Sequence, residues 1–233
     1  MKTAIIIMAR KGSGKHRAIV GGRPICDYPL EAASCVPLES FVFTDDPGVQ
    51  QRAATFRIPA LPREPSPDDQ LQSAGIQEAC FRLLDHGYNR EDGIIIMLGN
   101  SPTVTPQLIE EAAAILRERD SCVTAVQMPE CHPTRALLKG NNEVMSLIPP
   151  DGTCNRQDLQ PVFFYDYGIW GTKIGIALEN DGPSQWSWLS HDCEIIERKN
   201  PFHFDYHNKD ERLAMETIIA FNNQQKRQSH PCE

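Results

Sequence analysis

The sequence lacks a long apolar run, a net positive charge and a C-x-x-C pair, and each absence argues against a class of protein. The apolar run near the start, residues 4–9, is far shorter than the roughly 20 residues that a membrane-spanning helix needs. Basic residues follow this run instead of preceding it, the reverse of a secretory signal, so we expect a cytoplasmic protein with no membrane partner. The formal net charge of −8, from 23 Lys and Arg against 31 Asp and Glu, argues against a nucleic-acid partner.

The eight cysteines are scattered singly along the chain. Cys80 stands in a helix-like segment and Cys122 in a strand-like one, so we expect free thiols, buried or half-buried. Cys131 and His132 are adjacent, but no second pair stands at metal-ligand spacing, and a metal site there is not expected.

What the chain has is a regular alternation of apolar and helix-like segments. With 233 residues, 40% hydrophobic and 23% charged, it is long enough for one sizeable folded domain. Continuous apolar strands separated by helices indicate a mainly parallel sheet covered on both faces, and hence an α/β, Rossmann-like three-layer sandwich. In such a fold, ligands bind beyond the carboxyl ends of the strands. The expected strands are residues 4–8, 40–44, 93–98 and 122–126.

Capping and periodicity predict the helices. Residues 106–119 carry an apolar stripe after Thr105, a good N-cap, and residues 70–85 show a similar but weaker pattern. Near the end, Asn208 and Glu211 form a capping-box arrangement that predicts a last helix.

The second half of the chain has a different character, and no internal repeat is present. Residues 141–160 are polar and read as a loop, whereas 162–170 are rich in aromatic residues and read as a strand. We therefore expect a single domain over residues 1–233, with an inserted or appended excursion at about 138–190. The polar tail, 223–233, is expected to be frayed.

A basic loop near the amino end is the strongest functional signal. The first 26 residues contain six Lys and Arg and no acid, and most of them fall in residues 9–17, ARKGSGKHR, directly after the first expected strand. Glycines let backbone N–H groups approach a phosphate, and Lys and Arg compensate its charge. A solvated basic loop is the alternative. The segment is not a Walker A loop, because His16 follows Gly14 and Lys15, nor a G-x-G-x-x-G fingerprint.

The order of motifs resembles that of the cytidylyltransferases that make CMP-activated sugar acids, such as the CMP-sialic acid and CMP-Kdo synthetases. That family opens with a strand, then a loop like A-R-x-G-S-K-G-x-x-R, then G-G-K-P. The next motif is a strand that ends in S/T-D-D. Further along the chain come a D-S-V-V-S-V…H-P segment and R-Q-D-L-P-P. The segments that match are 9–17, 21–24, 30–33, 44–46, 120–126, 132–133, 156–161 (RQDLQP) and 204–205.

This resemblance implies a fold of the nucleotide-diphospho-sugar transferase type with a small dimerisation arm, and a homodimer. By resemblance, the excursion at about 138–190 serves the acceptor site or dimerisation. It implies transfer of CMP from CTP to a small acidic acceptor, with release of pyrophosphate and with Mg²⁺ as cofactor. By resemblance, Arg10 and Lys15 are catalytic, and Asp205 holds the metal. The nucleotide-binding residues implied are Ala9, Arg10, Gly12, Ser13, Lys15, Arg17 and Arg63, and the acceptor-binding residues are Asn100, Arg156, Gln157 and Tyr165.

Departures from the family pattern fall on the acceptor and metal side. Asn100 stands where the Kdo-type enzymes have a metal-binding Asp, and His207 replaces the second Asp of a D-x-D segment. The sequence therefore predicts retained CTP chemistry with an altered acceptor, either an unusual nonulosonic or octulosonic acid or a small phosphonate.

Other interpretations stay open. One is a catalytically weak relative that binds a nucleotide as a sensor or assembly subunit. Another is a sugar-nucleotide pyrophosphorylase for a different base, against which residues 156–159 argue. Asp205 could instead serve helix-terminus electrostatics, and Arg156 and Gln157 could belong to a surface loop at a subunit interface.

Overall fold

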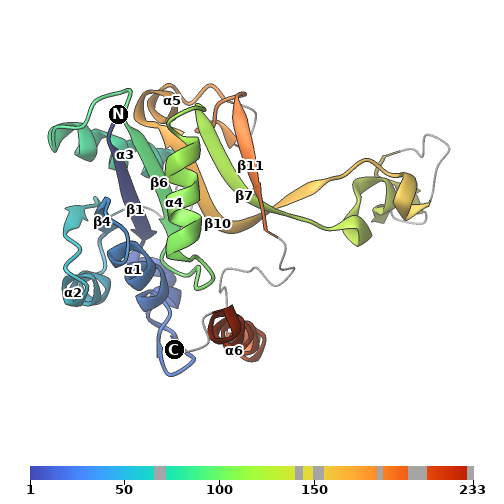
Figure 1. Ribbon diagram of the computed structural model, residues 1–233, viewed down its shortest axis with the longest axis horizontal. Helices are drawn as coiled ribbons and strands as arrows, with labels where there is room; N and C mark the ends of the chain where they lie inside the picture. The colour runs from blue at the N-terminus through green and yellow to red at the C-terminus, as the bar shows by residue number, and fades with distance from the viewer. Residues whose placement is uncertain (66–71, 140–143, 149–154, 183–185, 199–208, 230–233) are drawn as a thin grey trace.

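A seven-stranded sheet forms the centre of the computed structural model, which describes residues 1–233 apart from 66–71, 140–143, 149–154, 183–185, 199–208 and 230–233 (Figure 1). Its strand order is β11-β7-β10-β6-β1-β4-β5. Neighbouring strands pair in parallel, except that β10 runs antiparallel between β6 and β7. The strands are β1 (Thr3–Ala9), β4 (Glu39–Thr44), β5 (Ala60–Pro62), β6 (Gly93–Leu98), β7 (Ser121–Gln127), β10 (Phe163–Lys173) and β11 (Cys193–Glu197).

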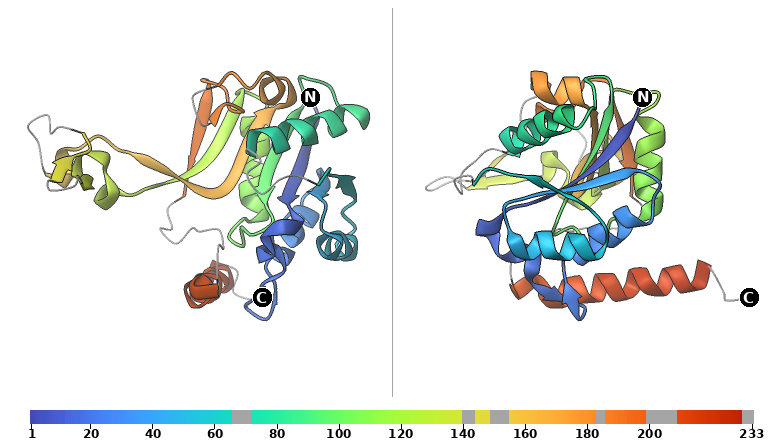
Figure 2. Two further views of the ribbon diagram at one scale, coloured as in Figure 1. Left: turned by 180° about the vertical axis from the view of Figure 1, so that it is seen from behind. Right: turned by 90° about the vertical axis from the view of Figure 1, so that its left-hand side faces the viewer.

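Helices cover both faces of this sheet, as the alternating pattern predicted. Side chains of β1 point alternately to the two faces: Ile5 and Ile7 join one apolar cluster, with α1, α2 and α4, while Ile6 joins the other, with α3 and α5. Figure 2 shows α3 and α4 on opposite sides of the strands. The three-layer α/β prediction is thus confirmed. The helices are α1 (Asp27–Ser34), α2 (Pro47–Thr55), α3 (Gln72–Asp85), α4 (Pro106–Ile115), α5 (Ile174–Glu179) and α6 (Arg212–Ser229).

The ends of two helices differ from the sequence prediction in different ways. Thr105 caps α4 as expected, because its hydroxyl accepts a hydrogen bond from the Leu108 N–H at 3.3 Å, but the helix ends at Ile115. In contrast, α6 continues to Ser229, so residues 223–229 are helical and not a frayed tail. Gln, Lys and Arg in this stretch are good helix formers, which outweighs its polar composition. The capping residue Asn208 lies outside the described residues.

The last helix lies against a small hairpin near the amino end. β2 (Ile19–Val20) pairs with β3 (Arg23–Pro24), and Val20 and Ile25 form a separate apolar cluster with Met215 and Ile219 of α6. The hairpin that follows the basic loop is therefore held in place by its apolar contacts with α6.

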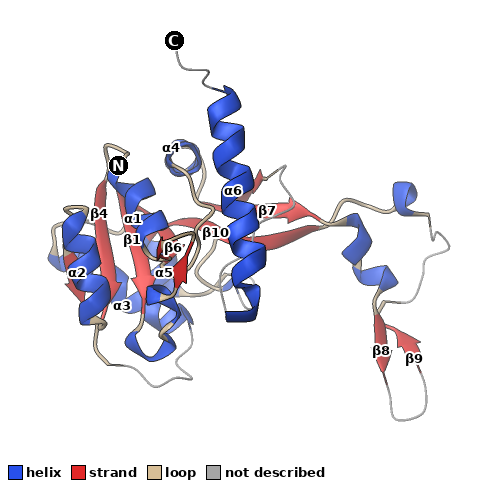
Figure 3. Ribbon diagram, turned by 90° about the horizontal axis from the view of Figure 1, so that it is seen from below, coloured by secondary structure: helices blue, strands red, loops and turns tan. Residues whose placement is uncertain are grey.

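An arm protrudes from the sandwich between β7 and β10 (Figures 1 and 3). Its described part includes a second hairpin, β8 (Leu137–Lys139) and β9 (Val144–Ser146), and a short 3₁₀ turn at Arg156–Asp158. The chain rejoins the sheet at Phe163, so the expected excursion is shorter than 138–190. Its second half belongs to the sandwich because Ile169, Trp170 and Ile174 are buried in the core.

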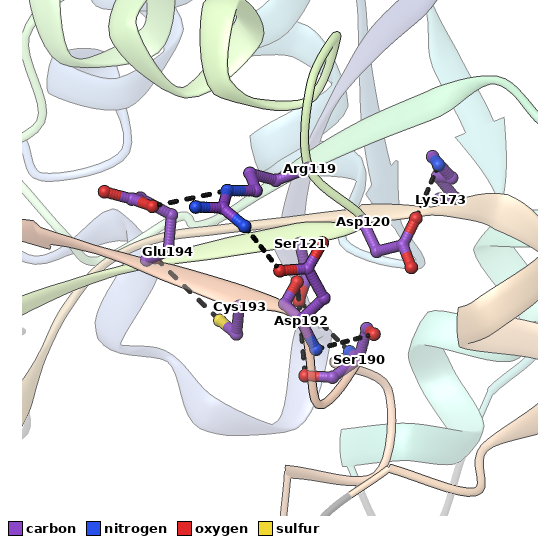
Figure 4. Close-up of polar contacts among 8 residues, drawn as sticks. All are labelled: Arg119, Asp120, Ser121, Lys173, Ser190, Asp192, Cys193 and Glu194. Carbon is purple, nitrogen blue, oxygen red and sulfur yellow. Dashed lines mark hydrogen bonds and ion pairs between the residues drawn. The ribbon is translucent and has the colours of Figure 1, made fainter.

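Polar contacts fasten the end of the sheet opposite to the carboxyl ends of its parallel strands (Figure 4). Arg119 forms ion pairs with Asp192 at 3.0 Å and with Glu194 at 3.6 Å, and Lys173 pairs with Asp120 at 2.5 Å. The Arg119 contacts tie β11 and the segment before it to the start of β7, and the Lys173 contact ties the end of β10 to the same place.

Two further predictions concern cysteines and membrane helices. The six cysteines in the described part of the chain are free; Cys26, Cys80 and Cys122 are buried and Cys193 is partly buried, as expected, whereas Cys35 and Cys131 are exposed. Among the helices described, none combines the length and the apolar character needed to cross a membrane.

Candidate active site

The basic loop begins where β1 ends and makes two tight 3₁₀ turns. These turns, Lys11–Ser13 and Lys15–Arg17, meet at Gly14, whose φ of 61° lies in the left-handed region that favours glycine. The loop is held against the end of β4: the Lys11 N–H donates to Asp45 at 2.8 Å, and Arg17 pairs with the buried Asp46 at 3.3 Å. The loop therefore has a fixed place at the carboxyl edge of the sheet.

A pocket of about 240 Å³ opens at this edge, beyond the ends of β1 and β6. It lies where a parallel α/β sheet is expected to bind its ligand. Five residues that the sequence singled out line it together: Ala9, Arg10, Lys15, Arg63 and Asn100. Three cationic residues from two segments, the basic loop and the stretch after β5, thus line one pocket.

Arg63 enters the pocket from the segment that follows β5. Its guanidinium carbon lies 5.4 Å from the centroid of the Phe43 ring. Partial burial lowers the pKa of Arg63, while the nearby Asp45 and Glu78 carboxylates raise it. Gly75 lies opposite, and a Cβ there would stand 3.6 Å from Arg63 Nη2. A planar guanidinium that lines a pocket is suited to paired hydrogen bonds with a flat acceptor.

Asn100 follows β6 in a buried loop, residues 99–105. It is only 1% exposed, as is its neighbour Ser101. Its side-chain amide is therefore a fixed, uncharged feature of the pocket.

His16 also lines the pocket, and the sequence analysis did not select it. It is 5% exposed and packs against Gly99, where a Cβ would stand 3.0 Å from His16 Nδ1. Burial first, and then the charge of Lys15, lower the pKa of His16 to about 4, so the imidazole is neutral at pH 7. A histidine in a basic loop gives no sequence signal of burial, because the burial depends on a glycine 83 residues further along the chain. Gln72 and Gly75 of α3 also line the pocket, and the sequence analysis did not select them, because α3 meets the basic loop only in the folded chain.

Other predicted residues do not line this pocket. Gly12 and Arg17 lie in the basic loop but are exposed, and the backbone of Ser13 belongs to the first 3₁₀ turn. Gln157 is exposed, and the turn that carries it and Arg156 lies on the arm, away from the sandwich (Figure 1). Asp205 and His207 lie outside the described residues.

Tyr165 lies on β10, beside a second, apolar cavity of about 420 Å³. Its ring stacks on Trp170 at 4.6 Å between centroids and contacts Tyr167 at 4.8 Å. The cavity is lined by side chains of β7, β10 and β11 and by Trp186. The structure thus places Tyr165 outside the pocket that holds Asn100.

A buried ion pair links β10 to the residue that follows β11, and no sequence pattern indicated it. Asp166 and Arg198 pair at 3.0 Å, with side chains 0% and 10% exposed. Burial lowers the pKa of Arg198, and Asp166 partly offsets this effect. The residues are 32 apart in the chain, so only the folded sheet brings them together.

Comparison with known proteins finds chains of similar sequence and chains of similar fold. No family model matches the chain. It is 26% identical over 201 residues to 3-deoxy-manno-octulosonate cytidylyltransferases of the Coxiella burnetii strains Dugway 5J108-111 and RSA 493, covering 77% of this chain and 79% of theirs.

Solved structures share the fold. A CMP:2-keto-3-deoxy-manno-octonic acid synthetase complexed with CTP has a TM-score of 0.63 and 20% identity, covering 97% of this chain and 100% of that one. A 4-diphosphocytidyl-2C-methyl-D-erythritol synthase from Anaerococcus prevotii has a TM-score of 0.68 and 11% identity, covering 94% of this chain and 96% of that one.

The sheet, its helix layers and these likenesses define the class: the chain has the fold of the nucleotide-diphospho-sugar transferase type, as predicted. Within this class, its similarity in sequence is to 3-deoxy-manno-octulosonate cytidylyltransferases. The resemblance indicated by the motifs is therefore confirmed.

Proposed function

We propose that this protein is a CTP-dependent cytidylyltransferase, which transfers CMP to a small acidic acceptor and releases pyrophosphate. The observation that carries the proposal is the convergence of Arg10, Lys15 and Arg63 in one pocket at the carboxyl edge of the sheet. The names of its relatives and structural neighbours, one of them complexed with CTP, support the choice of nucleotide.

In the proposed reaction, an oxygen of the acceptor attacks the α-phosphorus of CTP. The bond to the α,β-bridging oxygen breaks, and pyrophosphate leaves with its electron pair. Arg10 and Lys15 stabilise the charge that develops on the phosphates, and Arg63 binds the cytosine. A pocket fixed by the sheet holds the nucleotide in the orientation that in-line displacement needs.

Mg²⁺ is the proposed cofactor, and the described residues supply part of its ligand set. Mg²⁺ prefers oxygen ligands and is usually held by one or two carboxylates together with substrate phosphates. Among the described residues, no three Asp, Glu, His or Cys side chains cluster to form a site. The Asn100 amide offers one uncharged oxygen in the pocket. We propose Asp205 as the carboxylate that completes the set, with the metal neutralising charge on the triphosphate.

The acceptor is proposed to be a nonulosonic or octulosonic acid or a small phosphonate. Asn100 would hydrogen-bond it at the pocket, and Tyr165 would contact it from β10. Arg156 and Gln157 lie on the arm, so they would reach an acceptor only in a neighbouring subunit. The hairpin of the arm exposes apolar side chains that a second copy would cover, which supports a homodimer. These side chains are Leu137, Leu138, Met145, Leu147 and Ile148.

A catalytically weak relative that binds CTP as a sensor or assembly subunit is the second candidate. The uncharged Asn100 at the expected place of a metal-binding Asp favours it. The two candidates share a nucleotide pocket and differ only in turnover.

Pyrophosphate release from CTP in the presence of Mg²⁺ and a panel of acidic acceptors tests the proposal. Lys15→Ala is expected to abolish turnover or greatly raise the CTP requirement. Lys11→Ala is the matched control, because Lys11 lies in the same loop but does not line the pocket. Tight CTP binding without turnover on any acceptor favours the second candidate. Equal loss in both variants, or no affinity for CTP, contradicts a CTP site at this loop.

A further inference from the structure

The ion pair between Asp166 and Arg198 is the centre of a buried polar network that the proposed reaction does not use. Asp166 Oδ1 accepts hydrogen bonds from the Thr124 hydroxyl at 2.6 Å and from the Gly168 N–H at 3.1 Å. Its other oxygen, Oδ2, lies 3.0 Å from Arg198 Nη1. This single carboxylate thus links β7, β10 and the end of β11.

Arg198 extends the network to the loop that carries Asn100. Its Nη2 donates to the Thr103 carbonyl at 2.9 Å, while its backbone N–H donates to the Ala125 carbonyl at 2.8 Å. Ser101 adds a second tie, since its hydroxyl donates to the Tyr167 carbonyl at 2.6 Å. Loop 99–105 is therefore held at two points, one of them through the ion pair.

The same network holds an unusual backbone conformation in β10. Tyr167 has a φ of 58°, in the left-handed region that a non-glycine residue rarely adopts. It sits where the register of β10 against β7 shifts, between Tyr165 and Trp170. Conformations of this kind persist only where the surroundings enforce them, and they concentrate at functional sites. Asp166 and Gly168 on either side of Tyr167, together with Ser101, supply that enforcement.

A buried ion pair is weak evidence for stability, because well-packed apolar residues of similar size often serve a fold equally well. We therefore infer that Asp166 and Arg198 are positioning residues. They hold loop 99–105, which brings Asn100 to the pocket, in one placement relative to residues 165–167 of β10, where Tyr165 lines the separate apolar cavity. They thereby fix the relative positions of the two side chains that are proposed to contact the acceptor. The acceptor-binding part of this inference rests on the proposed function, but the relative placement of the two segments can be measured without it.

The experiment compares two pairs of substitutions in the full-length protein. Asp166→Asn with Arg198→Met removes both charges, keeps an oxygen that accepts from Thr124 and Gly168, and removes the tie to Thr103. Asp120→Asn with Lys173→Met is the control, because it removes an ion pair at the opposite end of β7 and β10 (Figure 4).

Amide hydrogen exchange is the first measurement, made without ligand. In the first pair, the amides of residues 99–105 and 166–169 are expected to exchange at least tenfold faster. In the control pair they are expected to be unchanged. Unchanged exchange in the first pair overturns the inference.

Kinetics is the second measurement, with CTP and with 3-deoxy-manno-octulosonate as the probe acceptor. The first pair is expected to raise the KM for the acceptor at least tenfold and to leave the Kd for CTP within twofold. A parallel loss of affinity for both overturns the inference in favour of a general structural role. If the wild type binds CTP but does not use the probe, 3-deoxy-manno-octulosonate is excluded as the acceptor, while the exchange result still decides the placement.

Ser101→Ala covers the case in which the first pair does not fold. It removes only the tie to Tyr167 and changes no charge. It is expected to accelerate exchange in the same two segments and in no others. If exchange there stays as in the wild type, the network does not position the loop.

Discussion

His16, which lines the pocket, is in direct contact with Gly99: a Cβ at Gly99 would stand 3.0 Å from His16 Nδ1 and 3.1 Å from the Ala9 Cβ. The absence of a side chain at position 99 lets the imidazole pack against the loop after β6, beside other residues that line the pocket. Two predictions depend on this contact.

Gly99→Ala is expected to weaken CTP binding about tenfold, which corresponds to about 1.4 kcal/mol. The added methyl group would stand closer than ordinary van der Waals contact to both neighbours, so His16 or the end of β1 must shift toward the pocket. Isothermal titration with CTP measures the effect. The double variant Gly99→Ala with His16→Ala restores the space and should recover part of the affinity. A double variant that is no better than the single one would show that the imidazole is not the obstacle.

The stability of the protein is expected to fall as the pH drops from about 6.5 to about 4, in part because of His16. The imidazole titrates near 6.5 when unfolded but near 4 in the folded state, so the unfolded chain binds the extra proton first. Below pH 4 this difference amounts to about 3 kcal/mol.

Urea unfolding of the wild type and of His16→Leu, followed between pH 7.5 and pH 4, isolates the contribution of His16. The variant replaces the imidazole by a side chain that does not titrate. Its stability should therefore decline less than that of the wild type across this window. Parallel pH curves for the two proteins would mean that His16 is solvated.

Ser121→Ala is expected to lower the free energy of unfolding by about 1–2 kcal/mol without changing CTP binding. The Ser121 hydroxyl is buried at the amino end of β7, where it accepts a hydrogen bond from the Ser190 N–H at 3.1 Å (Figure 4). Removal of the oxygen leaves this N–H without that acceptor. The Ser121 hydroxyl also donates to the Asp192 carbonyl at 3.3 Å. Ser34→Ala is the control, since the Ser34 hydroxyl likewise donates to a carbonyl but is exposed. Equal stability losses in the two variants would contradict this account.

Leu138→Lys with Met145→Lys is expected to convert the proposed homodimer into monomers. Both side chains are exposed on the hairpin of the arm, at 46% and 47%, and they face each other in the register of β8 and β9. Charged ammonium groups in an apolar interface would each lose their hydration on association. Light scattering after size exclusion gives the mass. Leu213→Lys, at a more exposed leucine on α6, should leave it unchanged. A wild type that is already monomeric at micromolar concentration would contradict the dimer itself.

The parts of the fold that the sequence predicted are those that local patterns determine. The apolar strands, the Thr105 cap and the basic loop after β1 each depend on neighbouring residues, and the structure has them where they were expected. The convergence of Arg10, Lys15 and Arg63 was predictable because parallel strands bring their carboxyl ends to one edge. The antiparallel insertion of β10 was not, since an apolar strand carries no mark of its direction.

Contacts between distant segments account for the residues that were missed. The burial of His16 depends on Gly99, and the pairing of Asp166 depends on Arg198. Neither relationship has a sequence pattern, because the residues meet only when strands from separate parts of the chain come together. Arg156 and Gln157 show the converse case: their motif was recognisable, but their position on the arm separates them from the pocket of their own chain.

The pairing of β7 with β10 has a consequence for the arm. Gln127, the last residue of β7, is the direct antiparallel partner of Phe163, the first of β10. Two strand ends in this relation are the ends that a tight hairpin turn joins in other proteins. A short turn grafted between Gln127 and Phe163 would therefore leave the path of every sheet strand as it is. Such a graft would separate the part of the chain that builds the sheet from the part that is proposed to associate.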